Sequence, residues 1–497
     1  MQNKLEDKGW LFWTLVAIVI KGIILSYFIF QSNTLYSAKM VYGTSLVSND
    51  YNYILRPVDN YFAYGTYTLE PGATGYFAGR MPGLSLPYML LRFVFEKENA
   101  LLLLAALQFL LAAFSVYILA RTAQLIIDNK MVFLSTFFLF AISTFTGIFD
   151  FMVGLSESFS VSTFILFFYF LVKYLKYNST KDILLSGCFL AWAIFLRPFL
   201  GLLIALVPLL LFVSQYKQLH FKKVFTSCFI FIAPFIFADS CWIVNNYLKA
   251  KQFIPLEQSA SGVYGTIYSP GWLAIRKFIL NTGGECAYYE TDSEAAWFRE
   301  ELDDATINNY AFPTRIYNNV SYNRDSLLAL RNIYRSYRKN ASELSAANPE
   351  MQQLDKQVVI IANRYTQQFV NGNSPTYLFY KFGKAFKRLV FKSGSSYLTL
   401  PSFSSMNLFQ KAIKIKYSLL YYLVLIVGSL GLIMLLKDHK KITLFMILFI
   451  ANLTATIVLF SDIQESRYFI TAYPLLLIAT VFSLYKLFPG FFKQKPN

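Results

Sequence analysis

Long apolar runs, separated by short polar segments, follow one another along most of this chain. A helix needs about 20 apolar residues to cross the hydrocarbon core of a bilayer. Runs of this kind predict about ten membrane-spanning helices, within a range of nine to twelve, at residues 10–30, 98–121, 131–148, 158–176, 183–214 (two helices), 224–245, 417–436, 442–460 and 468–488. We therefore expect an all-α polytopic membrane protein.

Basic residues gather beside the short loops on one side of these predicted spans. Lys4 and Lys8 precede the first run, and further basic clusters lie at residues 173–181, 215–223, 437–441 and 493–495. Cytoplasmic loops of membrane proteins carry an excess of lysine and arginine. All the clusters fit one topology, in which both chain ends are cytoplasmic and the two long polar segments lie outside.

The polar segments divide the chain into three predicted parts. Residues 1–245 form an N-terminal transmembrane catalytic module, whose outer loop 31–97 contains interfacial helices because residues 82–95 are apolar on one side. Residues 246–416 form a large extracytoplasmic region with helical polar patterns. Residues 417–497 add the C-terminal transmembrane helices and a short cytoplasmic tail.

Composition agrees with a membrane protein and narrows the chemistry. Of 497 residues, 56% are hydrophobic and 15% are charged, whereas about 25% is typical of soluble proteins. The formal net charge is +17, but the basic residues lie beside apolar runs, which indicates contact with membrane lipids and not with nucleic acid. The four cysteines show no CxxC spacing and the two histidines lie beside lysines, so neither a thiolate metal site nor histidine-centred catalysis is indicated.

Charged residues near the predicted outer ends of the spans are the candidates for chemistry. They are Asp50, Asp59, Arg80, Asp150, Glu157, Arg197, Asp239, Glu465 and Arg467. A carboxylate beside arginines suits transfer from a lipid phosphate, because the carboxylate can take a proton from an attacking hydroxyl while the arginines stabilise the leaving phosphate. Arg197 interrupts a long apolar run, where a charge is costly without a partner. The structural alternative is that charges simply end helices at the membrane surface.

Six short motifs, in order along the chain, carry a resemblance to a known family. They are NDYNYILRPVDNYFAYGTY and GRMPGLSLPYMLLRF in the first outer loop, then LSESFS, LRPFLG, WIVNNYLKAKQFIPL and SRYFITAYPLLL. With them the chain resembles the GT-C glycosyltransferases, in particular the group of protein mannosyltransferases and aminoarabinose transferases, and bacterial enzymes that depend on a polyprenyl-phosphate sugar. The matches cover most of residues 10–256 and 417–488. The chain departs from the family pattern at Tyr51, where a second acid often follows the first, and at Asn245, where relatives often have arginine.

The resemblance implies a role for several residues. Asp50 would be the general base, with Asp59 as the alternative base, and Arg80, Arg197 and Arg467 would bind the donor phosphate. A last group would orient the substrate, namely Tyr53, Asp150 and Glu157. No metal ligand set and no cofactor is assigned, although Asp150 and Glu157 could hold a divalent cation. An Asn-Asp turn at Asp50 and a helix-dipole contact at Glu157 are the structural alternatives.

The function expected from the resemblance is that of an inverting glycosyltransferase of the bacterial cytoplasmic (inner) membrane. It would move a hexosyl or pentosyl unit from a polyprenyl-phosphate donor to a hydroxyl of a glycan, lipid or protein acceptor on the extracytoplasmic face, as in the biosynthesis of cell-envelope polysaccharides. One alternative is a surface-polysaccharide polymerase or ligase that uses a lipid-diphosphate donor. Another is a flippase or transporter of lipid-linked sugars, which is disfavoured because the spans show no acids or bases strung along their interiors.

Overall fold

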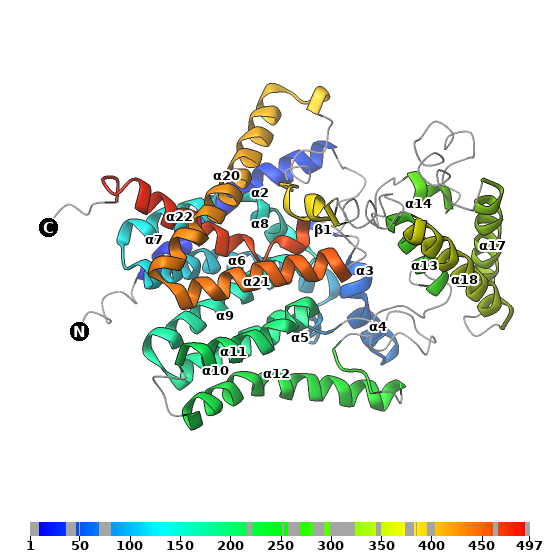
Figure 1. Ribbon diagram of the computed structural model, residues 1–497, viewed down its shortest axis with the longest axis horizontal. Helices are drawn as coiled ribbons and strands as arrows, with labels where there is room; N and C mark the ends of the chain where they lie inside the picture. The colour runs from blue at the N-terminus through cyan, green and yellow to red at the C-terminus, as the bar shows by residue number, and fades with distance from the viewer. Residues whose placement is uncertain are drawn as a thin grey trace.

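The computed structural model describes residues 9–35, 46–48, 50–68, 81–215, 221–250, 253–256, 269–281, 293–298, 324–343, 349–372, 382–383, 385–394, 403–460 and 466–492. Each predicted span coincides with an apolar helix or a pair of helices in these ranges (Figure 1). The helices are α2 (Trp10–Leu35), α6 (Lys97–Ile127), α7 (Lys130–Ala141), α8 (Thr144–Gly147), α9 (Glu157–Tyr177), α10 (Thr180–Leu196), α11 (Leu203–Gln215), α12 (Phe221–Ala250), α20 (Leu408–Asp438), α21 (Lys440–Phe460) and α22 (Tyr473–Leu487). The expectation of an all-α polytopic membrane protein is confirmed.

Fewer helices than ten have the full length of a span. Among the described residues, six helices are long and apolar enough to cross a membrane, and a seventh is added if α7 and the helices after it form one span bent by 45°. Two more apolar helices, at Pro198–Val213 and Tyr473–Leu487, are shorter. The predicted span 468–488 begins late because a 3-10 helix, η6 (Ser466–Phe469), precedes α22.

Tight turns between consecutive helices follow from local sequence. Helices α6 and α9 end at Asp128 and Asn178, both with positive φ, and the next residues, Asn129 and Ser179, cap α7 and α10 with their side chains. Asn and Asp tolerate the left-handed conformation, and short polar side chains satisfy the first free N–H groups of a helix. These turns therefore return the chain into the bundle within two residues.

Glycines set the closest approaches between helices of the bundle. A Cβ at Gly428 would lie 2.5 Å from the carbonyl oxygen of Leu476, and one at Gly431 would lie closer still to the carbonyl oxygen of Ala479. Helices α20 and α22 are thus in backbone contact, as small residues allow in membrane proteins. Gly187 gives α10 and α12 the same kind of contact at Phe231.

The polar region, residues 246–416, contains helices with a hydrophobic core of their own. Its helices α13 (Pro270–Asn281), α14 (Ser293–Phe298), α17 (Arg324–Glu343) and α18 (Pro349–Gly372) lie together beside the bundle (Figure 1). Trp272, Phe278, Leu330 and Val358 are among the buried residues of this core. Most of the described residues of the region are helical, and the predicted domain boundaries stay a prediction.

Short elements at the ends of the long helices carry the candidate residues. They are α3 (Tyr51–Ile54), α4 (Arg56–Tyr64), α5 (Ser85–Arg92), and the 3-10 helices η2 (Ile148–Phe151) and η3 (Pro198–Leu202). A two-residue parallel strand pair, β1 (Leu46–Val47) with β2 (Met152–Val153), joins the first polar segment to the segment before α9.

Candidate active site

Asp50 and Arg467 meet although 417 residues separate them. Asp50 is the N-cap residue of α3, and its Oδ2 lies 2.8 Å from Nη1 of Arg467 in η6. Both side chains are mostly buried, with exposed fractions of 16% and 14%. The structure therefore brings the predicted general base together with one of the predicted phosphate-binding arginines.

Glu157 joins this pair to a second arginine. It is the first residue of α9, its side chain is buried, and its Oε1 forms an ion pair with Arg197 and lies 3.5 Å from Nη1 of Arg467. The four side chains form one charged chain, Asp50–Arg467–Glu157–Arg197, which we call the acid–arginine group. Two acids and two arginines balance in charge, and buried ions require such pairing.

Aromatic rings flank the two arginines. The guanidinium carbons of Arg197 and Arg467 lie 5.2 and 5.7 Å from the ring centre of Tyr468, and Arg197 also lies 5.6 Å from the ring of Phe199. Such cation–π contacts stabilise a partly desolvated guanidinium. Nε of Arg197 is buried and has no hydrogen-bond partner among the described residues, so it is an unsatisfied donor within the site.

The sequence around Arg197 explains how it enters the site. Pro198 restricts the residue before it to extended backbone, and Arg197 ends α10 with φ −148° and ψ 98°. A Cβ at Gly83 would clash with the backbone of Phe195, and Trp192 Nε1 donates to the Gly83 carbonyl at 3.0 Å. The MPG motif of the first polar segment therefore packs directly against the helix end that carries Arg197.

Asp59 lies in a separate charged cluster. Its carboxylate accepts hydrogen bonds from the hydroxyls of Tyr88, at 3.0 Å, and of Tyr51, and forms ion pairs with Arg92 at 3.4 Å and Lys97 at 3.2 Å. Burial and the nearby Asp59 charge raise the pKa of Tyr88, so its hydroxyl stays a donor. The cluster ties α4 to α5 and to the start of α6, and we call it the Asp59 cluster.

Asp150 is buried apart from the acid–arginine group. Its Oδ2 lies 2.5 Å from Nζ of Lys21, and its Oδ1 accepts a hydrogen bond from the Ser158 hydroxyl at 2.6 Å. Lys21 lies buried within α2, so the first span holds one charged residue, although a single lysine is not a series of acids or bases along a span. A lone lysine inside an apolar run is the sequence signal that could have identified it.

The remaining predicted residues are placed as follows. Tyr53 belongs to α3, and Arg80 and Glu465 lie outside the described residues. Asp239 accepts a hydrogen bond from the backbone N–H of Leu256 at 2.9 Å and so holds the chain after α12. Among the described residues no group of three or more His, Cys, Asp or Glu side chains could hold a metal ion. Asp150 and Glu157, the acids considered for a divalent cation, are paired with lysine and arginine side chains instead.

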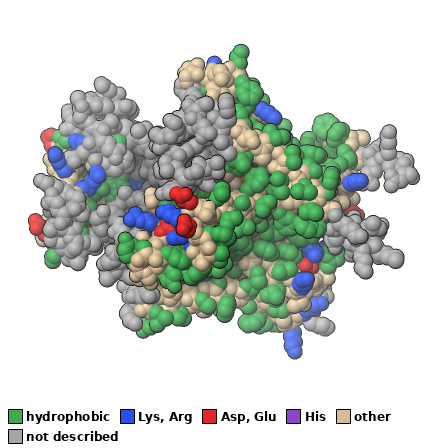
Figure 2. Space-filling model, turned by 180° about the vertical axis from the view of Figure 1, so that it is seen from behind, with side chains coloured by type: hydrophobic (Ala, Val, Ile, Leu, Met, Phe, Trp, Pro, Cys, Tyr) green, Lys and Arg blue, Asp and Glu red, His purple; other side chains and the backbone are tan. Residues whose placement is uncertain are grey.

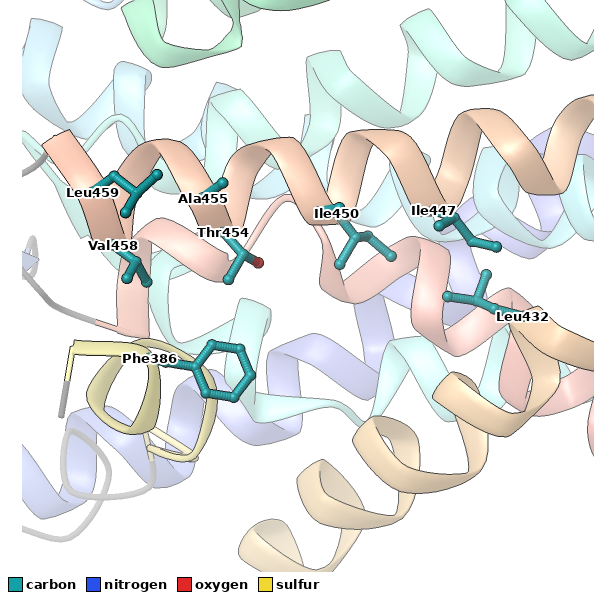
Figure 3. Close-up of a pocket in the computed structure, with 9 residues that line it drawn as sticks. Phe386, Leu432, Ile447, Ile450, Thr454, Ala455, Val458 and Leu459 are labelled. Carbon is teal, nitrogen blue, oxygen red and sulfur yellow. The ribbon is translucent and has the colours of Figure 1, made fainter. Parts of the chain in front are cut away.

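On the face of the molecule shown in Figure 2, acidic and basic side chains form separate groups, and the surface between them is largely hydrophobic. An open apolar groove of about 460 Å³ runs along α21. Figure 3 shows side chains of α21, from Ile447 to Leu459, lining it together with Phe386 and Leu432. Helix α21, which lines the groove, also contacts η6, the segment that carries Arg467.

No protein-family model matches the chain, and no curated protein matches its sequence. Among solved structures, it is similar to archaeal oligosaccharyltransferase from Archaeoglobus fulgidus in complex with an inhibitory peptide and a dolichol-phosphate, with a TM-score of 0.46 and 12% identity. It is also similar to an Archaeoglobus fulgidus oligosaccharyltransferase in the apo form, with a TM-score of 0.48 and 11% identity.

Both alignments cover 97% of this chain and 51% of the solved chain, so this chain spans about half the length of the proteins it matches. The likeness is one of backbone arrangement, at TM-scores below 0.5. At this level of identity it assigns no residue, and the chemistry proposed below is taken from the side chains of the acid–arginine group.

Proposed function

We propose that this protein is an inverting glycosyltransferase that moves a monosaccharide from a polyprenyl-phosphate donor to a hydroxyl of a glycan, lipid or protein acceptor. The observation that carries the proposal is the acid–arginine group, in which a candidate base and two phosphate-binding side chains from distant parts of the sequence meet at helix ends. The reaction takes place at the outer face of the membrane, and the membrane is the bacterial cytoplasmic membrane.

In the proposed reaction Asp50 accepts the proton of the acceptor hydroxyl. The hydroxyl oxygen forms a bond to the anomeric carbon of the sugar, and the bond from that carbon to the phosphate oxygen breaks on the opposite side, which inverts the configuration. The electron pair leaves with the lipid phosphate. Arg197 and Arg467 stabilise its charge through charge-assisted hydrogen bonds.

Arg467 links donor binding to the release of the base. In the free protein its guanidinium is shared between Asp50 and Glu157. A donor phosphate can compete for Arg467, because the planar guanidinium matches phosphate geometry as it matches carboxylate geometry. When the phosphate takes Arg467, the Asp50 carboxylate becomes available to the acceptor hydroxyl, so the donor binds before the base acts.

The groove along α21 suits the apolar chain of the donor. Its lining residues are almost all hydrophobic, and both α20 and α21 are long enough to cross a membrane. An isoprenoid chain in this groove gains van der Waals packing against the apolar side chains while its phosphate reaches the arginines. The polar region, with its separate core, would shape the acceptor side of the site.

The proposal is tested with purified protein in liposomes and a radiolabelled polyprenyl-phosphate sugar. Asp50→Asn should lower the rate of transfer by about 10²–10⁴-fold, the usual contribution of a general base, with donor binding retained. Asp438→Asn is the control, since Asp438 pairs with Lys486 at the other end of α22. Transfer by Asp50→Asn near the wild-type rate contradicts the assignment of the base. Lipid movement across the bilayer without any transfer contradicts the enzyme class.

A further inference from the structure

A second buried ion pair lies outside the acid–arginine group and joins α2 to η2. Lys21 of α2 and Asp150 of η2 are 2.5 Å apart, with side-chain exposed fractions of 2% and 5%. The second carboxylate oxygen of Asp150 accepts the hydrogen bond from Ser158. A charged pair in the interior of a membrane protein is expensive to bury, and such residues usually serve function.

Asp150 is linked to Asp50 through the strand pair. Strand β2 begins two residues after Asp150, and Ser48, which follows β1, donates its backbone N–H to the Val153 carbonyl at 2.9 Å. The backbone N–H of Asp50 then donates to the Ser48 hydroxyl at 3.2 Å. Gly154, with φ +89°, lies so close to Tyr51 that an added Cβ would be 3.1 Å from its backbone. The segment that contains Asp150, residues 148–154, which we call the Asp150 loop, therefore fixes the backbone position of Asp50.

Asp150 is also linked to Glu157. The donor of its second hydrogen bond, Ser158, is the neighbour of Glu157 in the first turn of α9. Gln108 of α6 holds the same loop from another side, with its amide donating to the carbonyls of Phe149 at 2.7 Å and Met152 at 3.1 Å. Both acids of the acid–arginine group are therefore supported by elements that meet at Asp150.

We propose that Lys21 is a positioning residue of the active site. Through Asp150 it fixes the distance between Asp50 and Glu157, and so allows both acids to reach the one guanidinium of Arg467. The proposal rests on the proposed function only for its catalytic consequence, because the positioning itself is a property of the backbone around β1 and β2. Lys21 contributes no atom to the reaction.

Variants can distinguish a positioning role of Lys21 from a purely structural role of its ion pair. Lys21→Met leaves Asp150 charged and unpaired, and it could lower stability whatever the role of Lys21. The double variant K21M/D150N removes both charges and keeps the Ser158 contact, so it should recover the thermal stability. Met cannot bond to Asn, however, so the link from α2 to the Asp150 loop stays broken.

The measurements are kcat, the KM for the lipid donor, melting temperature and amide hydrogen exchange. For the double variant we expect a wild-type melting temperature, a kcat lowered by about 100-fold as for a misplaced reacting group, and a KM for the donor changed little. Exchange of the amides of Ser48 and Asp50 should become about ten-fold faster, because local opening no longer breaks the Lys21 contact.

Lys486→Met is the matched control, since it breaks the 2.6 Å ion pair with Asp438 at the far end of α22 and should change neither kcat nor this exchange. A double variant with wild-type kcat and wild-type exchange at Ser48 and Asp50 overturns the proposal. The exchange result decides it even if the wild-type protein transfers no sugar, in which case the proposed function fails by itself. Exchange accelerated only globally, together with a lowered melting temperature, also counts against it.

Discussion

Asp50 and Asp59 lie nine residues apart in the same polar segment, and each is paired with an arginine, yet their surroundings differ. The partners of Asp59 come from neighbouring short helices, and tyrosines and bases surround its two oxygens. Asp50 meets an arginine from the other end of the chain, and it shares that arginine with Glu157. A shared guanidinium can be exchanged for a phosphate, whereas a locally saturated carboxylate holds helices together.

The largest effect is expected when Asp50→Asn is compared with Asp59→Asn. We expect Asp50→Asn to lose about 10²–10⁴-fold in kcat, with a smaller loss of stability than Asp59→Asn, because Glu157 remains as a partner of Arg467. Asp59→Asn should instead lower the free energy of unfolding by about 1–3 kcal/mol, because it removes the acceptor of two ion pairs, and should largely keep kcat. Transfer assays and thermal unfolding of the same preparations measure both effects. The reverse pattern would make Asp59 the base.

The two arginines provide the next comparison. Arg467→Lys should lower kcat by about 10²–10³-fold, because a lysine ammonium cannot bridge Asp50 and Glu157 or offer a planar pair of donors to phosphate. Arg92→Lys is the matched change in the Asp59 cluster and should alter kcat by no more than about three-fold, as expected for a partly exposed ion pair. Equal losses in both variants would remove the distinction between the two clusters.

Asp355 in the polar region is a buried acid whose hydrogen-bond partners are neutral, and its pKa is raised. It accepts hydrogen bonds from the backbone N–H of Gly271 and from Ser269, and burial raises its pKa from 3.8 to about 6. The folded region therefore binds this proton more tightly than the unfolded chain does, and stability falls as the pH rises through this range. Asp355→Asn should raise the free energy of unfolding at pH 7 by about 2 kcal/mol, and the gain should vanish near pH 4.

Thermal unfolding at the two pH values, followed by exchange in α13 and α18, measures this effect. Asp325→Asn, at an exposed position of α17, is the control. A stability difference between Asp355→Asn and wild type that is the same at both pH values would contradict the raised pKa.

The smallest expected effect concerns Tyr88. Tyr88→Phe removes one of several donors to Asp59 and should lower the free energy of unfolding by about 1 kcal/mol without changing kcat. Thermal unfolding and the transfer assay measure the two quantities. A clear loss of kcat would show that the Asp59 cluster acts on the reaction and not only on the packing of α4 and α5.

The sequence predicts the membrane helices well, because an apolar run of sufficient length has few other stable conformations. Asp50, Glu157, Arg197 and Arg467 were singled out one by one, from charges at helix ends and from motifs. Their partnership could not be predicted, since it depends on how helices hundreds of residues apart pack.

Two further failures have physical causes. The role of Asp150 beside substrate stays a prediction, but its buried ion pair is not foreseen from the sequence, because its partner Lys21 lies unnoticed within an apolar run. The short α22 was predicted as a full span because the hydrophobicity of residues 468–488 does not reveal the 3-10 turn that bears Arg467.

The glycines of α20 give the chain a mechanical property that no charged residue supplies. Gly428 and Gly431 leave no space between α20 and the backbone of α22, so the position of one helix fixes the position of the other. The segment that precedes α22 carries Arg467. A single methyl group added at either glycine would force α20 and α22 apart, so we expect it to displace Arg467 without altering any charge. The distance between two apolar helices therefore helps to fix the position of Arg467, and substitutions far from the reacting atoms can change that position.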